Sequence, residues 1–277
     1  MIAAVCALGA SLAWGLGDFL GGLKSRTVPL LVVLLLAQIS GLVGVAIAVG
    51  IAGNPPPDAS VLWAAVAGLF GTVGLASFYR GMAVGSISVV APIVAVAAIV
   101  PVTFGIATGD DVSAAQLGGF ALALAGVALA SFERREGGDA QVAAGVPWAL
   151  AAIVGFGGYY VPMHEASEQD FLWAALIFRA TVGLLALAAW VVLRPPLAAA
   201  KGSLGTIALI GVADTLGNVL FAAASNQGEV SVVSVLSTLY PVTTVALAAL
   251  VLSERLARHQ LLGVVAALAG VVLISAG

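Results

Sequence analysis

The sequence predicts an all-α, polytopic membrane protein, and three observations support this fold class. Apolar residues make up 62% of the 277-residue chain and charged residues only 8%, whereas charged residues contribute about a quarter of an average soluble domain. Ten apolar stretches each approach the roughly 20 residues that a helix needs to cross a bilayer. The connectors between these stretches are too short to form a soluble catalytic or nucleotide-binding domain.

The ten expected helices follow one another along the whole chain. Polar or charged connectors delimit them: Lys24 and Arg26 follow the first, Asp58 precedes the third, and Arg80 ends it. Pro92 and Pro101 lie in the fourth, where the carbonyls they free need partners inside a bundle or along a cavity. We expect the spans at 2–21, 29–51, 60–83, 87–107, 115–132, 144–163, 171–193, 204–225, 230–252 and 260–276.

Several classes of function are excluded by missing motifs. Lys24 and Lys201 are the only lysines, and neither ends a Gly-x-x-x-x-Gly-Lys loop, so no ATP-driven motor is expected. His164 and His259 have no metal-ligand spacing, and Cys6 has no second cysteine to pair with. No Gly-x-Ser-x-Gly nucleophile elbow is present. We therefore expect no enzyme, no metal and no cofactor, and the net charge of −3 gives no reason to expect a nucleic-acid partner.

The basic residues are distributed unevenly between the two sets of connectors. Nine of the ten lie in or beside the connectors that follow the odd-numbered spans: Lys24, Arg26, Arg80, Arg134, Arg135, Arg194, Lys201, Arg255 and Arg258. The tenth, Arg179, lies within the seventh span. Because basic residues near short loops mark the cytoplasmic side, we expect both termini outside and a multi-pass location in the plasma (inner) membrane.

The two halves of the chain resemble each other. Residues 116–131 align with 260–275 at ten identities in sixteen positions. Gly74 aligns with Gly217 and Gly85 with Gly228, while Gly15 and Gly17 align with Gly155 and Gly157. We predict two repeats of five helices each, over 1–136 and 143–277. An odd number of spans inverts the second repeat, and inverted repeats with a site near the midplane are typical of secondary transporters.

Short motifs make the chain resemble the EamA-type ten-helix transporters of the drug/metabolite transporter superfamily. The resembling segments are Trp14-Gly15, Asp18-Phe19-Leu20-Gly21-Gly22, Phe78-Tyr79-Arg80-Gly81, Ser88-Val89-Val90-Ala91-Pro92, Ser253-Glu254-Arg255-Leu256 and Gln260-Leu261-Leu262-Gly263. The resemblance implies export or uptake of small metabolites such as amino acids, through a cavity lined by helices 1, 3, 4, 6, 8 and 9. Connector 52–58 departs from the family because it lacks Lys and Arg, and so does Gly109-Asp110-Asp111, where Gly-Glu-Arg is more usual.

Three charged residues within the expected spans are candidates for a functional role: Asp214 and Arg179 at a depth where each costs roughly 2.5–3.5 kcal/mol on insertion scales, and Asp18 near the inner end of the first span. Asp214 forms a polar stripe with Asn218 and Ser225; we expect it to contact substrate or carry a coupling proton, with a structural hydrogen bond as the alternative. Arg179 either pairs with Asp214, holds an anionic substrate group, or snorkels to the interface. Asp18 either gates the cytoplasmic side or forms a local charge pair with the nearby basic residues.

Further polar and aromatic residues are candidates for the cavity wall. Ser231, Ser234 and Thr238 share one helix face, although hydroxyls at such positions also serve helix packing. Trp14 is placed too deep for an interfacial belt. Interfacial anchoring is the alternative for the aromatic candidates at helix ends. The predicted substrate-binding residues are Trp14, Tyr79, Tyr160, Asp214, Asn218, Ser234 and Thr238, and the coupling or gating residues are Asp18, Arg179 and Asp214.

Together these features predict a secondary active transporter working by alternating access, as a monomer or homodimer in the lipid bilayer. A largely apolar cavity with few charges suits small neutral or zwitterionic amphiphiles. Proton coupling would use Asp214. The alternative is a passive channel or lipid scramblase, which would pass its substrate without saturation.

Overall fold

The computed structural model describes residues 2–100, 113–130, 132–134, 140–168, 170–225, 236 and 239–276. Helices dominate this part of the chain. They are α1 (Ile2–Lys24), α2 (Leu30–Ala52), α3 (Trp63–Val84), α4 (Ile87–Ala95), α6 (Ala114–Ala130), α7 (Val146–Ser167), α8 (Phe171–Leu193), α9 (Leu204–Ser225), α11 (Tyr240–Leu252) and α12 (Arg258–Ala276). Three short 3₁₀ helices join them: η1 (Ala59–Leu62), η2 (Val96–Ala98) and η3 (Leu197–Ala200).

Every expected span contains a helix within the described residues. Six helices of the described chain are long and apolar enough to cross a membrane, and α6, α11 and α12 are shorter apolar helices. The expected spans 171–193 and 204–225 coincide with α8 and α9. The fourth span is interrupted, because α4 contains Pro92 and passes into η2 at Val96. The rest of that span, and the first part of the ninth, lie outside the described residues.

The connector between α6 and α7 contains the one pair of strands in the described residues, which the sequence did not predict. β1 (Phe132–Arg134) and β2 (Ala140–Val142) pair antiparallel, with Phe132 opposite Val142. The Phe132 carbonyl accepts a hydrogen bond from Gln260 Nε2 at 3.2 Å and lies 3.0 Å from His259 Nε2. These contacts attach the connector to the first turn of α12. The described chain is otherwise helical, as expected, and this short pair is an addition in one connector.

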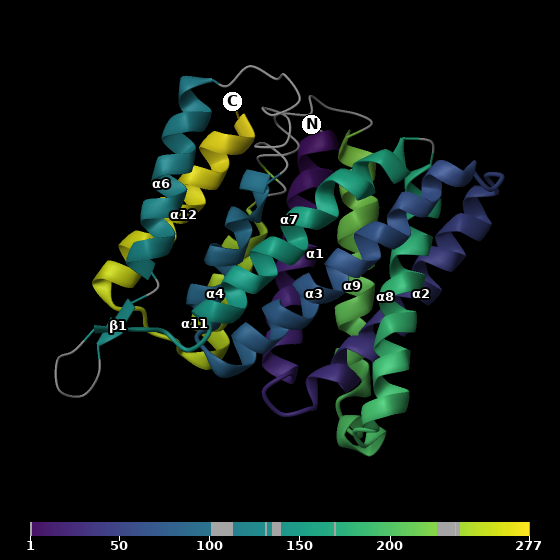
Figure 1. Ribbon diagram of the computed structural model, residues 1–277, viewed down its shortest axis with the longest axis horizontal. Coiled ribbons are helices and arrows are strands. Elements are labelled where there is room, and N and C mark those ends of the chain that lie inside the picture. The colour runs from purple at the N-terminus through teal and green to yellow at the C-terminus, as the bar shows by residue number, and fades with distance from the viewer. Residues whose placement is uncertain are drawn as a thin grey trace.

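The last helices of the two sequence repeats pack directly on each other and run antiparallel (Figure 1). A Cβ atom on Gly119 would lie 2.8 Å from the Gly270 carbonyl oxygen, and one on Gly126 would lie 2.6 Å from that of Gly263. Residues that increase in number along α6 therefore meet residues that decrease along α12. Glycine is required at this crossing because the two backbones touch without intervening side chains.

Glycines give the same close approach at two other pairs of helices. Gly217 of α9 packs on the Trp14 ring of α1, and Gly74 of α3 packs on the Phe156 ring of α7. In the two sequence repeats α7 is the counterpart of α1, and α9 is the counterpart of α3. The contact between α1 and α9 therefore corresponds to the contact between α7 and α3.

The approach of α9 to α2 has a counterpart in the approach of α3 to α8. Gly211 of α9 lies against Ala37 and Ser40 of α2, just as Gly68 of α3 lies against Phe178 and Thr181 of α8. Gly68 and Gly211 therefore make corresponding contacts.

One part of the sequence alignment is shifted by two residues in the structure. Gly15 packs on Thr243, and Gly157 packs on Val100. These two contacts correspond, so Gly15 matches Gly157 and not Gly155 as aligned from sequence. Both helices contain several small residues close together, so the alignment of Gly15 with Gly155 looked as good as the alignment of Gly15 with Gly157.

The connectors lie at two opposite ends of the bundle. At one end, Lys24 Nζ donates to Ser203 Oγ at 3.4 Å, and Arg26 contacts Glu254 at 3.0 Å. Together with the contact between β1 and α12, these bonds connect the loops that follow α1, α6, α8 and α11, and the bond from Arg26 to the Gly85 carbonyl adds the loop that follows α3. We call this end, where the connector lysines and arginines gather, the basic face. Both chain termini lie at the end opposite β1 (Figure 1).

Candidate functional site

A charged cluster lies where α2, α8 and α9 meet. Arg179 of α8 is only 1% exposed and forms an ion pair through its Nη2 with Asp214 Oδ2 of α9. Its Nη1 donates to Gln38 Oε1 of α2 at 3.4 Å. The helices come this close because Gly41 and Gly211 carry no side chains at the contact. Arg179, Asp214 and Gln38 are the centre of what we call the central cluster.

The ion pair decides between the alternatives for Arg179. Its side chain is buried among helices and directed at Asp214, so the snorkelling alternative is wrong. A guanidinium in a low-dielectric interior needs a counter-ion nearby, because an unpaired buried charge carries a large desolvation cost. Within the described part of the chain, the Arg179 Nε atom still lacks a hydrogen-bond partner. The charge of Arg179 is therefore paired, but one of its hydrogen-bond donors has no acceptor among the described residues.

Asp214 is the more exposed member of this ion pair. Its side chain is 37% exposed, against 1% for Arg179. Asp18 of α1 lies within electrostatic range of the Asp214 carboxylate, and Tyr79 of α3 lies within range of both acids and of Arg179. We include Asp18 and Tyr79 in the central cluster, which then combines two carboxyl groups with one guanidinium.

The expected local charge pair of Asp18 is not formed. Lys24 bonds instead to Ser203, and Arg26 bonds to Glu254 and to the carbonyls of Met82 and Gly85. Asp18 itself has no hydrogen bond or ion pair to any described residue. Both basic side chains point to the basic face, away from the half-buried Asp18.

The interfacial alternative for Tyr79 is also wrong. Tyr79 is 4% exposed, and its ring lies against Gly21 of α1. Its neighbour Arg80 is exposed and stacks over the Trp148 ring at 5.9 Å. The two adjacent residues thus point to different environments, because consecutive helix positions face about 100° apart.

Trp14 and Asn218 bind each other beside the central cluster. Trp14 Nε1 donates to Asn218 Oδ1 at 3.0 Å. The Trp14 ring is 5.7 Å from the ring of Phe221 and 6.4 Å from that of Tyr240. Asn218 lies one helical turn from Asp214, so these two members of the expected stripe contact neighbouring helices, while the side chain of Ser225 is outside the described part of the chain. The side chains of Trp14 and Asn218 connect α1 to α9 in the interior of the bundle.

We expect replacement of this pair to have a modest effect on stability. Trp14→Phe and Asn218→Ala each remove the hydrogen bond, and the coupling free energy from a double-mutant cycle should be about 0.6–1.7 kcal/mol. Thermal unfolding of the two single variants and the double variant in detergent measures it. Additive effects would show that the two side chains do not stabilise each other.

Some predicted site residues lie outside the described part of the chain. Ser234 and Thr238 are among the residues not described, and the side chain of Tyr160 within α7 is not described either. Their predicted role in substrate binding stays a prediction.

A second polar cluster lies on the basic face, at the first turn of α4. The Glu254 carboxylate accepts hydrogen bonds from Ser86 Oγ at 2.8 Å and from the backbone N–H groups of Ser88 at 3.0 Å and Ile87 at 3.3 Å. Arg26 pairs with the same carboxylate at 3.0 Å. Ser86 is the N-cap of α4 but forms no cap bond of its own. We call these residues, together with Arg26, the Glu254 cluster.

Glu254 remains ionised in this environment. Burial by itself would raise its pKa, but the hydrogen bonds from the Ser88 backbone, the Ser86 hydroxyl and the Arg26 guanidinium lower the pKa below its ordinary value. These bonds favour the charged form. Their stabilising contribution is complete above the ordinary pKa of a glutamate and is lost as the pH falls through the lowered pKa. The cluster is therefore intact at neutral pH.

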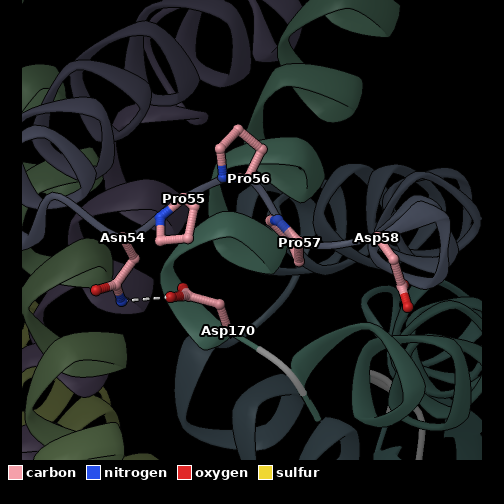
Figure 2. Close-up of a pocket in the computed structure, with 6 residues that line it drawn as sticks. All are labelled: Asn54, Pro55, Pro56, Pro57, Asp58 and Asp170. Atoms are coloured by element: carbon pink, nitrogen blue, oxygen red, sulfur yellow. Dashed lines mark hydrogen bonds between the residues drawn. The ribbon is translucent and has the colours of Figure 1, made fainter.

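A shallow pocket occurs at the end opposite the basic face. It is lined by Asn54, Pro55, Pro56, Pro57, Asp58 and Asp170 (Figure 2). Asn54 Nδ2 donates to Asp170 Oδ2 at 2.5 Å, and Asp170 also caps the N-terminus of α8 by accepting from the Trp173 N–H. Both residues are engaged in holding the connector to α8, so the pocket is a feature of loop packing. The described residues contain no group of acids, histidines and cysteines that could hold a metal ion.

The helices and the buried ion pair together define a polytopic membrane protein with charged residues inside its bundle. The model of the EamA-like transporter family matches the chain twice, over residues 1–132 and 143–276. The chain belongs to the EamA-like transporter family, and the resemblance seen in its motifs is confirmed.

The comparison with solved structures adds information on the fold alone. A crystal structure titled only as that of a protein is similar over 98% of this chain and 95% of its own, with a TM-score of 0.62 and 18% sequence identity. No curated protein matches the chain.

Proposed function

We propose that the protein is a secondary active transporter that moves a small molecule across the membrane by alternating access. The observation that carries the proposal is the central cluster: a fully buried arginine paired with a partly accessible aspartate, in the middle of apolar helices. Charged residues at this depth are costly and mark substrate or ion pathways. Membership of a family of membrane transporters supports the same conclusion.

We further propose that residues 1–136 and 143–277 form two repeats of opposite orientation. The antiparallel packing of α6 on α12 supports this, since the sequences of these two helices are the most alike in the two halves. The contact that Gly74 makes corresponds to the contact that Gly217 makes, and the contact of Gly68 corresponds to that of Gly211, which supports the two repeats as well. Alternating access in such proteins is a rocking of one repeat against the other around a central site.

The central cluster suggests how transport is coupled. The cluster contains two carboxyl groups and one guanidinium, which pairs with Asp214, so Asp18 has no counter-ion among the described residues. Because Arg179 pairs with Asp214, we now favour Asp18 as the group that exchanges a proton, with Asp214 and Arg179 setting its electrostatic environment. This changes the sequence-based preference for Asp214.

The substrate would bind beside these acids. Trp14, Asn218 and Tyr79 would form the described part of its wall, and Tyr160, Ser234 and Thr238 the remainder. Such a site suits small amphiphilic molecules that are neutral, zwitterionic or carry an amine. By the charges of the basic face, that end of the bundle would be cytoplasmic and both termini would lie outside the plasma membrane.

The test starts with a thermal-shift screen of the purified protein against amino acids, nucleosides, polyamines and cationic drugs, since a ligand of the native state raises the melting temperature. The compound that raises it most is then used for flux into proteoliposomes. Saturable uptake with counterflow exchange is expected. Flux without saturation would favour a passive channel or scramblase and overturn the proposal.

Proton coupling is tested on the same preparation. Asp18→Asn should abolish uptake driven by a pH gradient while leaving counterflow exchange, because exchange needs no net proton movement. Asp18 has no ion pair with any residue that the structure describes, so among those residues this variant leaves no buried charge unpaired. Gradient-driven uptake that continues unchanged in Asp18→Asn would remove Asp18 from the coupling mechanism.

A further inference from the structure

The Glu254 cluster connects the two halves of the chain at the basic face. Glu254 belongs to the second half, in the connector between α11 and α12, whereas the described residues that its carboxylate binds belong to the first half. Its carboxylate takes the place of a helix cap at the N-terminus of α4, where free N–H groups and the helix dipole favour negative charge.

Arg26 completes the connection from a third connector. Its Nε donates to the Met82 carbonyl at 3.1 Å and its Nη2 to the Gly85 carbonyl at 2.9 Å, at the C-terminal end of α3. Arg26 thus holds the end of α3 while Glu254 holds the start of α4, and the two side chains bind each other. Their side chains are 28% and 14% exposed, so solvent weakens the pair only in part.

These bonds must break if the halves separate at this end. A shift of the α11–α12 connector away from α4 would leave two backbone N–H groups and a charged carboxylate without partners. Charge-assisted hydrogen bonds are the strong ones in proteins. Behind the cluster, α4 packs on α11, and Thr244 of α11 is 0% exposed and donates to the Gly15 carbonyl of α1 at 3.1 Å.

We propose that the Glu254 cluster is a latch that holds the basic face closed in the state seen here, and that it opens when the transporter turns to that side. The proposal rests on the proposed function. It assigns to Glu254 and Arg26 a gating role distinct from substrate binding in the central cluster.

The test measures access to a buried thiol in lipid nanodiscs, where both faces meet a polar maleimide and no substrate is needed. All variants carry Cys6→Ser. Thr244→Cys reports on the interior behind the latch, more than two helical turns from Glu254. Ser11→Cys, at a residue that is 3% exposed in the half of α1 nearer the N-terminus, reports on the other end.

Glu254→Ala removes all the bonds of the carboxylate and should raise the labelling rate at position 244 by at least about tenfold, which is the factor for the loss of a single charge-assisted hydrogen bond, without raising the rate at position 11. Arg26→Ala removes the same contact from the other side and should act in the same direction. The double variant should add little, because both substitutions break one latch. Arg255→Ala, at an exposed neighbour of Glu254, is the matched control and should change neither rate.

Three outcomes would overturn the latch. They are unchanged labelling at position 244 in both Glu254→Ala and Arg26→Ala, equal acceleration at positions 244 and 11, which indicates general loosening, and acceleration by Arg255→Ala as large as by Glu254→Ala. None of these measurements depends on flux. A failure of the transporter proposal in proteoliposomes is therefore distinguishable from a failure of the latch.

Discussion

Asp214→Ala should lower the free energy of unfolding by about 3–5 kcal/mol, which is the cost of removing one partner of a buried ion pair. Arg179 is 1% exposed and would remain charged, and among the described residues the amide oxygen of Gln38 would be the one acceptor left to its guanidinium. Thermal and denaturant unfolding of the variant in detergent, followed by circular dichroism, would show the loss.

A double variant distinguishes an unpaired charge from lost packing. Arg179→Met combined with Asp214→Leu removes both charges and should be more stable than Asp214→Ala alone, because apolar replacements of buried ion pairs are often neutral. Asp18→Asn provides the control, since Asp18 forms no ion pair within the described part of the chain and its replacement should cost far less. Equal stability losses in Asp214→Ala and Asp18→Asn would contradict a stabilising role for the Arg179–Asp214 pair.

Gly126→Ala should be the second strongly destabilising change, by about 1–3 kcal/mol, the usual cost of overpacking. The new Cβ would lie against the backbone of α12 at Gly263 and Ala267, and main-chain atoms cannot rotate aside. The two helices would have to separate along their whole contact. The midpoint of thermal unfolding and the protein's elution profile in gel filtration would report the change.

Gly118→Ala in the same helix is the matched control. A Cβ atom at that position meets nothing within 4 Å, and alanine favours helix over glycine by up to about 1 kcal/mol. This variant should therefore be as stable as the parent chain or slightly more so. A loss of stability in Gly118→Ala that equals the loss in Gly126→Ala would mean that glycine serves helix flexibility here and not close packing.

The helices themselves could be predicted closely from hydropathy. The span 171–193 coincides with α8 because Asp170 caps its start and Pro195 and Pro196 follow its end. The break between α4 and η2 was less predictable, since a proline within an apolar run indicates a bend without giving its place. The β1–β2 pair could not be predicted, because three-residue strands depend on their attachment to α12.

The candidate site was predicted in its charges but not in its partners. Arg179 and Asp214 stood out because charges in apolar helices are rare, yet three arrangements of Arg179 agreed with the sequence. Gln38 was missed, although it is the one side-chain amide in a helix whose other residues are apolar except Ser40, and it could have been noticed for that reason. Glu254 was seen only as part of a motif, because its partners are more than 160 residues away in the chain.

The contact between Gln38 and Arg179 bears on how such a chain could arise. By the corresponding contacts of Gly68 and Gly211, position 38 in α2 is the counterpart of position 179 in α8. Two identical five-helix subunits assembled in this way would have to carry the same side chain at both places, and two guanidinium groups would then repel each other across the symmetry axis. Gene fusion removes that restriction, because a single polypeptide can keep the cation in one copy and a neutral acceptor in the other.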